Sequence, residues 1–242
     1  MKPLKHLTNN HMINVNNLSK KYGSTTVLSL SSLTITKGEH FGLVGNNGAG
    51  KTTLFSLILD LIQASSGEVT INSINVAKSE AWKNQTAAFV DDNFLIDYLT
   101  PEEYFDFVAQ LRKIDPKTLK DFLVRFEEFF NGEVLNQKKY IRDFSKGNQK
   151  KIGLAAAFIG QPELIILDEP FANLDPSSQI RLKNFLSSDE NKGTTLLVSS
   201  HDLNHVTDVC DRIVLLEKGE VIKDTPKSAA TLKELETYFS EQ

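Results

Sequence analysis

The stretch Gly45-Asn46-Asn47-Gly48-Ala49-Gly50-Lys51-Thr52-Thr53 decides the fold of this chain. An apolar run, 41–44, precedes it and a second, 54–59, follows it, which predicts a strand, a glycine-rich loop and a helix in succession. A glycine, four residues and then Gly-Lys-Thr form the spacing of a phosphate-binding loop, and that spacing is specific when it lies between a strand and a helix. We therefore expect residues 45–53 to hold a nucleoside triphosphate.

Each residue type in this loop has a chemical role. Glycines let several backbone N–H groups converge on a polyphosphate because no Cβ restricts φ, and the helix that begins near Gly50 adds its positive dipole end. Lys51 is expected to reach the β- and γ-phosphates, and the Thr52 hydroxyl to ligate Mg²⁺. The alternative is a glycine-rich turn with a solvated lysine, which the flanking strand and helix disfavour.

The composition limits the class of protein. With 242 residues, of which 40% are hydrophobic, the chain is long enough to bury a core, and one compact unit is the simplest interpretation. The formal net charge of −4 and the lack of long basic runs argue against a nucleic-acid partner. Cys210 is the only cysteine, so no disulfide framework is possible, and we expect a buried, inert thiol there.

The sequence carries no candidate membrane span. The first twelve residues lack the apolar region of a signal peptide and are expected to form a loose arm. The most apolar stretch, Ile152 to Gly160, is far shorter than the roughly 20 residues that a membrane-spanning helix needs. If the protein works at a membrane, another chain must therefore cross it.

The remaining periodicities predict an α/β fold. Strand patterns fill 13–44, 68–71 and 86–90, and a helical stretch rich in aromatic residues, which we assign to the core, opens at Thr100-Pro101. Beyond Pro162, predicted strands (164–167, 194–198, 213–216) alternate with predicted helices (177–186, 203–210, 228–239). The prediction is one domain, 1–242, with a P-loop NTPase core (1–96 and 161–242), a mostly parallel sheet, N-terminal antiparallel strands and an inserted α-helical subdomain at 97–160.

A second part of the site follows the buried strand Leu164-Ile165-Ile166-Leu167. Asp168 and Glu169 come directly after it, and ligands of open α/β sheets collect at the carboxyl ends of strands. We expect Asp168 to hold Mg²⁺ opposite Thr52, and Glu169 to activate a water in line with the γ-phosphate. The alternative is an acidic strand end closed by Pro170.

This order of motifs resembles that of the ATP-binding subunits of ABC transporters, and the resemblance covers the chain from about Ile13 onward. Ser145 lies 23 residues before Asp168, which fits the family's spacing between its signature motif and this strand end. The matching segments are a signature, Phe144-Ser145-Lys146-Gly147-Asn148, a D-loop, Asn173-Leu174-Asp175, a switch histidine, His201, and Tyr22 where the family places an aromatic residue that stacks on adenine.

The resemblance implies an ATPase with Glu169, His201 and Lys51 in catalysis. It implies a homodimer, or a pair with another ABC ATPase, that closes on two ATP molecules, each held between the loop of one subunit and Ser145, Lys146, Gly147 and Asn148 of the other. Asp175 would couple the two sites. It also implies separate transmembrane permease subunits docked near residues 91–130, and a cytoplasmic position on the inner face of the cell membrane.

Three positions depart from the family pattern. Lys146 stands where glycine is usual and Asn148 where glutamine is usual, although similar Ser-Lys-Gly signatures occur in some ABC exporter ATPases. The Q-loop glutamine corresponds to Asp91 or Asp92, and Asp91 is taken as a third candidate Mg²⁺ ligand. An ionised carboxylate ligates Mg²⁺, but it cannot donate a hydrogen bond as an amide does.

The leading hypothesis is the ATPase subunit of a transporter, and we favour an exporter. A soluble, non-transport ABC ATPase is the alternative, but the chain has no tandem second cassette, long coiled-coil insertion or basic surface. A module that only senses ATP conflicts with the presence of both Glu169 and His201.

Overall fold

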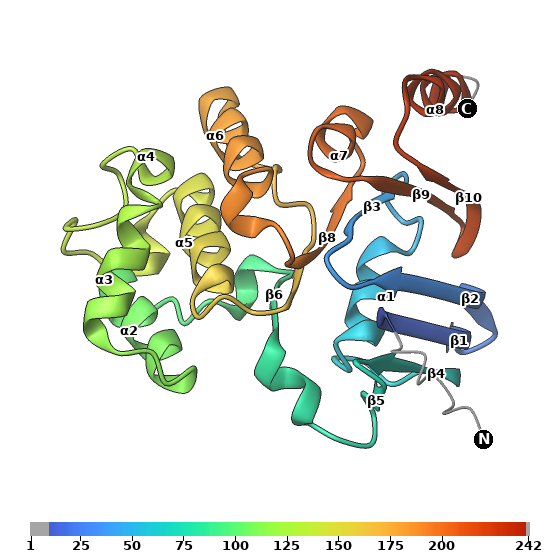
Figure 1. Cartoon of the computed structure of the whole chain (residues 1–242), viewed down its shortest axis with the longest axis horizontal. Coiled ribbons are helices and arrows are strands. Elements are labelled where there is room, and N and C mark those ends of the chain that lie inside the picture. Colours follow the sequence, from blue (N-terminus) through green and yellow to red (C-terminus); the bar gives the residue numbers. More distant parts are fainter. Residues whose placement is uncertain (1–9, 241–242) are drawn as a thin grey trace, which may run out of the picture.

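The strands of the computed structural model, which describes residues 10–240, form two sheets (Figure 1). The first sheet has the order β2-β1-β4-β5 with antiparallel pairing throughout. Its strands are β1 (His11–Tyr22), β2 (Thr25–Thr36), β4 (Ser66–Ile71) and β5 (Ile74–Asn75). The predicted N-terminal antiparallel strands are therefore confirmed.

The second sheet has the order β10-β9-β3-β8-β7-β6. Five of its strands run parallel, and β10 pairs with β9 in the antiparallel sense. Its strands are β3 (His40–Val44), β6 (Thr86–Phe89), β7 (Leu164–Leu167), β8 (Thr195–Ser200), β9 (Arg212–Glu217) and β10 (Glu220–Pro226). Because the carboxyl ends of the parallel strands share one edge, the loop after β3 and the acids after β7 meet there.

Both faces of the parallel sheet are buried, which explains why its strands are continuous apolar runs. In β7, Leu164 and Ile166 face one apolar cluster, and Ile165 and Leu167 face the other. Helix α1 (Lys51–Ile58) packs into the first cluster together with residues of the antiparallel sheet. Helices α5 (Lys146–Phe158), α6 (Pro176–Leu186), α7 (Leu203–Val209) and α8 (Ala229–Ser240) contribute to the second.

The predicted helical region is present and contains α2 (Pro101–Leu111), α3 (Pro116–Val124), α4 (Glu127–Phe130) and the start of α5 (Figure 1). Thr100 and Glu103 form a capping box at α2, and Asp115 caps α3. Most of the aromatic residues are core, as predicted, and Phe126 packs against the Phe185 ring at a centroid distance of 4.5 Å. Phe107 is the exception, because it is 41% exposed. The boundaries of the subdomain, 97 and 160, stay a prediction.

Several element boundaries differ from the sequence-based expectation. The strand β1 begins at His11, and Met12 is buried, so the prediction of a loose arm was wrong for these two residues. Residues 1–9 of that predicted arm lie outside the described part of the chain. The sequence also missed β10, because none of its residues is buried and its apolar residues Val221 and Ile222 are adjacent, so no alternation of apolar and polar residues marks a strand. Cys210 lies just beyond α7 and is buried, which raises the pKa of its thiol, as the expectation of an inert cysteine requires. Within residues 10–240, no helix combines the length and the hydropathy needed to cross a membrane.

Candidate functional site

The glycine loop after β3 has the backbone conformation that its sequence predicts. Gly48 and Gly50 have φ values of 83° and 107°, which residues with side chains rarely adopt. Gly50 is the N-cap of α1 and supplies no side-chain hydrogen bond, and no acidic residue stands in the first turn. The N–H groups at this helix end are thus left for a ligand. A Cβ at Gly45 would lie 2.3 Å from the carbonyl oxygen of Leu216, so the neighbouring strand end excludes any side chain there.

The turn between β9 and β10 supports this loop through backbone hydrogen bonds. The N–H of Gly219 donates to the carbonyl of Ala49 at 2.9 Å, and the Gly219 carbonyl accepts from the N–H of Ser29 at 2.8 Å. Gly219 has a φ of 81°, and a Cβ on it would come within 2.4 Å of the Val27 carbonyl oxygen. A hollow of about 490 Å³ adjoins the loop and is lined by Asn46, Asn47, Gly48, Ala49, Glu217 and Lys218.

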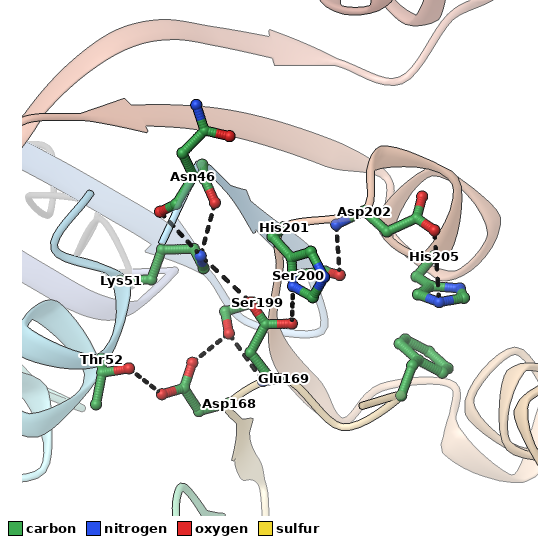
Figure 2. Close-up of polar contacts among 12 residues, drawn as sticks. Asn46, Lys51, Thr52, Asp168, Glu169, Ser199, Ser200, His201, Asp202 and His205 are labelled. Atoms are coloured by element: carbon green, nitrogen blue, oxygen red, sulfur yellow. Dashed lines mark hydrogen bonds and ion pairs between the residues drawn. The ribbon is translucent and has the colours of Figure 1, made fainter. Parts of the chain in front are cut away.

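Lys51 points back across the loop toward the end of β7 (Figure 2). Its side chain is only 6% exposed, and Nζ donates to the carbonyl of Gly45 at 2.6 Å and to that of Asn46 at 3.4 Å. The same ammonium lies 3.2 Å from Oε1 of Glu169. The lysine of the glycine loop and the second acid after β7 therefore lie together, and their roles in catalysis stay a prediction.

Thr52 and Asp168 also meet, at the carboxyl end of β7 (Figure 2). The Thr52 hydroxyl donates to Oδ2 of Asp168 at 2.5 Å, and the Ser199 hydroxyl donates to Oδ1. Burial raises the pKa of Asp168, while these two hydrogen bonds oppose the rise. A hydroxyl and a carboxylate are hard oxygen ligands, so the pair suits Mg²⁺ bound by one or two protein groups and by phosphates. Among residues 10–240, no group of three or more acidic, histidine or cysteine residues could hold a metal ion by itself.

Glu169 is held by its backbone and its side chain. Its φ is 46°, in the left-handed region. Its N–H donates to Oγ of Ser199 at 2.9 Å, and its carbonyl accepts from Nζ of Lys150 at 3.0 Å. Nδ1 of His201 lies 2.9 Å from Oε2 (Figure 2). The predicted base and the predicted switch histidine are therefore neighbours.

The signature residues form the start of α5. Ser145 is its N-cap and accepts from the N–H of Asn148 at 3.3 Å, while Nζ of Lys146 donates to Oε1 of Gln149 at 3.1 Å. A Cβ at Gly147 would lie 2.8 Å from the carbonyl oxygen of Asn173, so the signature packs closely on the D-loop of the same chain.

The other predicted residues have local partners. Asp175 caps α6: its carboxylate accepts from the hydroxyls of Ser177 and Ser178 and from the Ser178 N–H, and these bonds lower its pKa. Tyr22, at the end of β1, is 56% exposed, with the Lys20 ammonium 4.8 Å from its ring centroid. Asp91 accepts from the N–H of Asn93 at 2.8 Å and so caps a short 3₁₀ turn. Its role as a metal ligand stays a prediction.

Two residues of the site were missed by sequence reasoning. Ser199 bonds both acids that follow β7. Val198 pairs with Leu167, so the residues next along the chain, Ser199 and Asp168, meet. Lys150 gave no such signal, because its contact with Glu169 depends on how α5 packs against the end of β7, and sequence spacing does not reveal that packing.

Comparison with known proteins identifies the family of the chain. A family model described as "ABC transporter" matches residues 28–172, more than half of the chain. The chain belongs to the ABC transporter family. It is 31% identical to an uncharacterised ABC transporter ATP-binding protein, YhaQ, of Bacillus subtilis, over 96% of this chain and 75% of that protein. It is 32% identical to the bacitracin transport ATP-binding protein BcrA of Enterococcus faecalis, over 88% of this chain and 69% of BcrA.

This ABC family member spans little more than half of some relatives. It is 36% identical to the protein all4389 of Nostoc over 79% of its own length but only 57% of that protein. Among solved structures, an ATP-binding subunit of an ABC transporter superposes with a TM-score of 0.79 at 29% identity, covering 95% of this chain and 93% of the other. A dimeric ATP-binding cassette superposes with a TM-score of 0.75 at 23% identity, covering 90% and 100%, and supports the fold alone.

Proposed function

We propose that this chain binds Mg-ATP, hydrolyses it and powers an ABC transporter, most simply an exporter. The observation that carries the proposal is the chain of contacts from Lys51 through Glu169 to His201, next to the bonded pair Thr52 and Asp168. All five side chains come from the first turn of α1 or from residues that directly follow β7 and β8, at one edge of the sheet.

Binding would use the glycine loop first. The N–H groups of residues 45–53, at the N-terminal end of α1, would face the triphosphate. Lys51 would exchange its carbonyl partners for phosphate oxygens. The exposed ring of Tyr22 would stack on adenine. Thr52 and Asp168 would hold Mg²⁺, which neutralises charge on the phosphates when it is bound.

Hydrolysis would then depend on Glu169. Phosphoryl transfer mainly requires a positioned water and stabilised charge, so a carboxylate that accepts the water's proton is the expected general base. His201 holds one carboxylate oxygen and fixes the direction of the other. When a γ-phosphate attracts Lys51, the opposite oxygen of Glu169 loses its ammonium partner and is free to orient water.

The complete site would require two copies of the chain, or this chain and a related ATPase. In this proposal, Ser145, Lys146, Gly147 and Asn148 of one copy complete the site around the ATP held by the other, and ATP closes the dimer. The capping position of Ser145 supports the proposal, because it places the positive end of the 13-residue helix α5 at the signature. Asp175 lies two residues after Asn173, whose carbonyl lies against Gly147 of the signature, and it would link the two sites.

The permease would dock beside the helical region. A cavity of about 380 Å³ lies between β6, α2 and α5, and it is lined largely by apolar side chains, among them Phe89, Phe94, Leu95 and Val108. Phe94 is 63% exposed, and Tyr98 nearby is 64% exposed, as expected for a surface that receives another protein. This chain would then lie at the inner, cytoplasmic face of the membrane. Similarity to the bacitracin transport protein BcrA supports export.

The test has two arms. Phosphate release from Mg-ATP by the purified chain, compared with Lys51→Ala, tests hydrolysis; equal rates for the two proteins would contradict the proposed site. Purification of the tagged chain from detergent-solubilised membranes tests transport. Recovery of a multi-span membrane protein is expected, whereas recovery of soluble partners alone would favour a non-transport ABC ATPase.

A further inference from the structure

We propose that Lys150 is a positioning residue that fixes the peptide of Glu169 and so aims its carboxylate. The inference rests on the proposed ATPase function, since it assigns a role within that site. Lys150 belongs to α5, the helix that begins with the signature, and not to β7, β8 or the glycine loop.

The environment of Lys150 is unusual for a lysine. The residue is 7% exposed, and its Nζ donates to the Glu169 carbonyl at 3.0 Å and lies 5.8 Å from the centroid of the Phe89 ring. A buried ammonium is costly unless polar or aromatic groups compensate it. The carbonyl of Glu169 is therefore the main polar contact that stabilises the buried ammonium of Lys150.

The peptide that Lys150 contacts needs support. Glu169 has a φ of 46°, in the left-handed region that residues with a Cβ rarely adopt and that surrounding contacts must maintain. Ser199 binds its N–H from one side and Lys150 binds its carbonyl from the other. With both polar groups of the residue fixed, the side chain leaves the backbone toward Lys51 and His201.

The contact also joins two functional segments of one chain. The N-terminal end of α5 touches the D-loop at Gly147 and Asn173, and Lys150, one turn further along, touches the residue after Asp168. A displacement of α5 caused by ATP at the signature would therefore change the Glu169 peptide. In the proposed dimer, Lys150 would let the nucleotide bound by the partner influence hydrolysis in this chain's own site.

The helix offers a matched control. Lys151, the next residue, is 2% exposed, but its Nζ pairs with Glu133 at 3.1 Å and lies 6.0 Å from the centroid of the Phe129 ring. Lys150→Met and Lys151→Met each remove one buried ammonium from α5 while keeping a long apolar side chain. Lys150→Met should misplace the carboxylate of Glu169, whereas Lys151→Met should affect stability alone.

Steady-state ATP hydrolysis separates these effects. Lys150→Met is expected to lower kcat at least about tenfold with KM for ATP nearly unchanged, because misplacement of a reacting group costs rate rather than binding. Lys150→Gln, which keeps an N–H donor, should recover part of that loss, and Lys151→Met should keep the kcat of the wild type. In a Glu169→Gln background, Lys150→Met should add little, since it acts through Glu169.

Equal losses in the two lysine variants, or a full additional loss in the Glu169→Gln background, would overturn the proposal. A crystal structure of nucleotide-free Lys150→Met gives a readout that needs no activity: residue 169 should leave the left-handed region or its carboxylate should leave Lys51, and an unchanged peptide would overturn the role. If the wild type hydrolyses no ATP, the proposed function fails, while the crystal structure still decides whether Lys150 holds this peptide.

Discussion

Nζ of Lys51 lies 3.2 Å from Oε1 of Glu169, so the lysine expected to bind phosphate and the acid expected to activate water neutralise each other across the site. Such a pair is only partly exposed and is therefore screened less than a surface ion pair. A γ-phosphate competes directly with Glu169 for this ammonium. Binding and activation are thereby linked through one side chain.

Replacing Glu169 by glutamine tests that link. Glu169→Gln should keep ATP affinity, or improve it, because Lys51 loses a competing carboxylate, yet turnover should fall at least about a hundredfold with the loss of the general base. Nucleotide titration and phosphate release measure the two effects. Gel filtration with ATP should show the variant as a dimer, with the exposed Glu127→Gln as a control that hydrolyses normally. A persistent monomer at high protein and ATP concentration would count against the proposed dimer.

When ionised at neutral pH, the buried carboxylate of Asp168 should lower the free energy of unfolding relative to a neutral side chain at this position. Burial raises its pKa above the unfolded value, so its contribution to stability is greatest when it is protonated and is lost as pH rises through the folded-state pKa. Asp168→Asn should therefore melt at a higher temperature than the wild type at pH 7 to 8, and the difference should shrink on acidification. Thermal melts across pH measure this, and a variant less stable than the wild type at every pH would contradict the assignment. The same variant should lose Mg²⁺-dependent hydrolysis.

Asp175 combines a capping role with a proposed coupling role, and two variants separate them. Asp175→Ala removes the N-cap of α6 and should cost about 0.5–2 kcal/mol in urea denaturation. Asp175→Asn keeps a capping oxygen and should leave stability nearly unchanged. If Asp175→Asn nevertheless lowers ATP turnover, the carboxylate acts beyond the cap, and normal turnover would limit Asp175 to the helix end.

Gly153 lies on α5 where the helix crosses β6, and it has no room for a side chain. A Cβ there would lie 2.0 Å from Cε2 of Phe89. Gly153→Ala should therefore cost about 1–3 kcal/mol of unfolding free energy, as overpacking does. Phe89→Leu in the same chain should recover part of that loss by making space. Independent, additive losses in the double variant would show that the contact is not the cause.

The residues that sequence reasoning identified are those whose chemistry is local. The glycine loop with Lys51 and Thr52 is recognisable by its residue spacing. The acids after β7 are recognisable by their position directly after a strand. Glu169 and His201 follow neighbouring strands of a parallel sheet, and the structure does bring them into contact.

What the sequence missed depends on packing between distant segments or on irregular backbone. The bond from Lys150 to Glu169 crosses from a helix to a strand end, and no periodicity encodes it. The strand β10 gave no recognisable pattern because it lies at the sheet edge with no buried residue, and its apolar residues Val221 and Ile222 are adjacent. Asp91, chosen for its likeness in position to a glutamine, is engaged by the N–H of Asn93, a local turn that competes with any other role.

The hairpin of β9 and β10 contains none of the residues proposed to bind phosphate, yet it supports the nucleotide loop through Gly219. Its two backbone bonds fasten Ala49 on one side and Ser29 on the other. A chain altered only at residue 219 would keep every recognisable motif and still lose the rigidity with which it grips its ligand. Damage to binding can therefore originate in a turn that motif searches ignore.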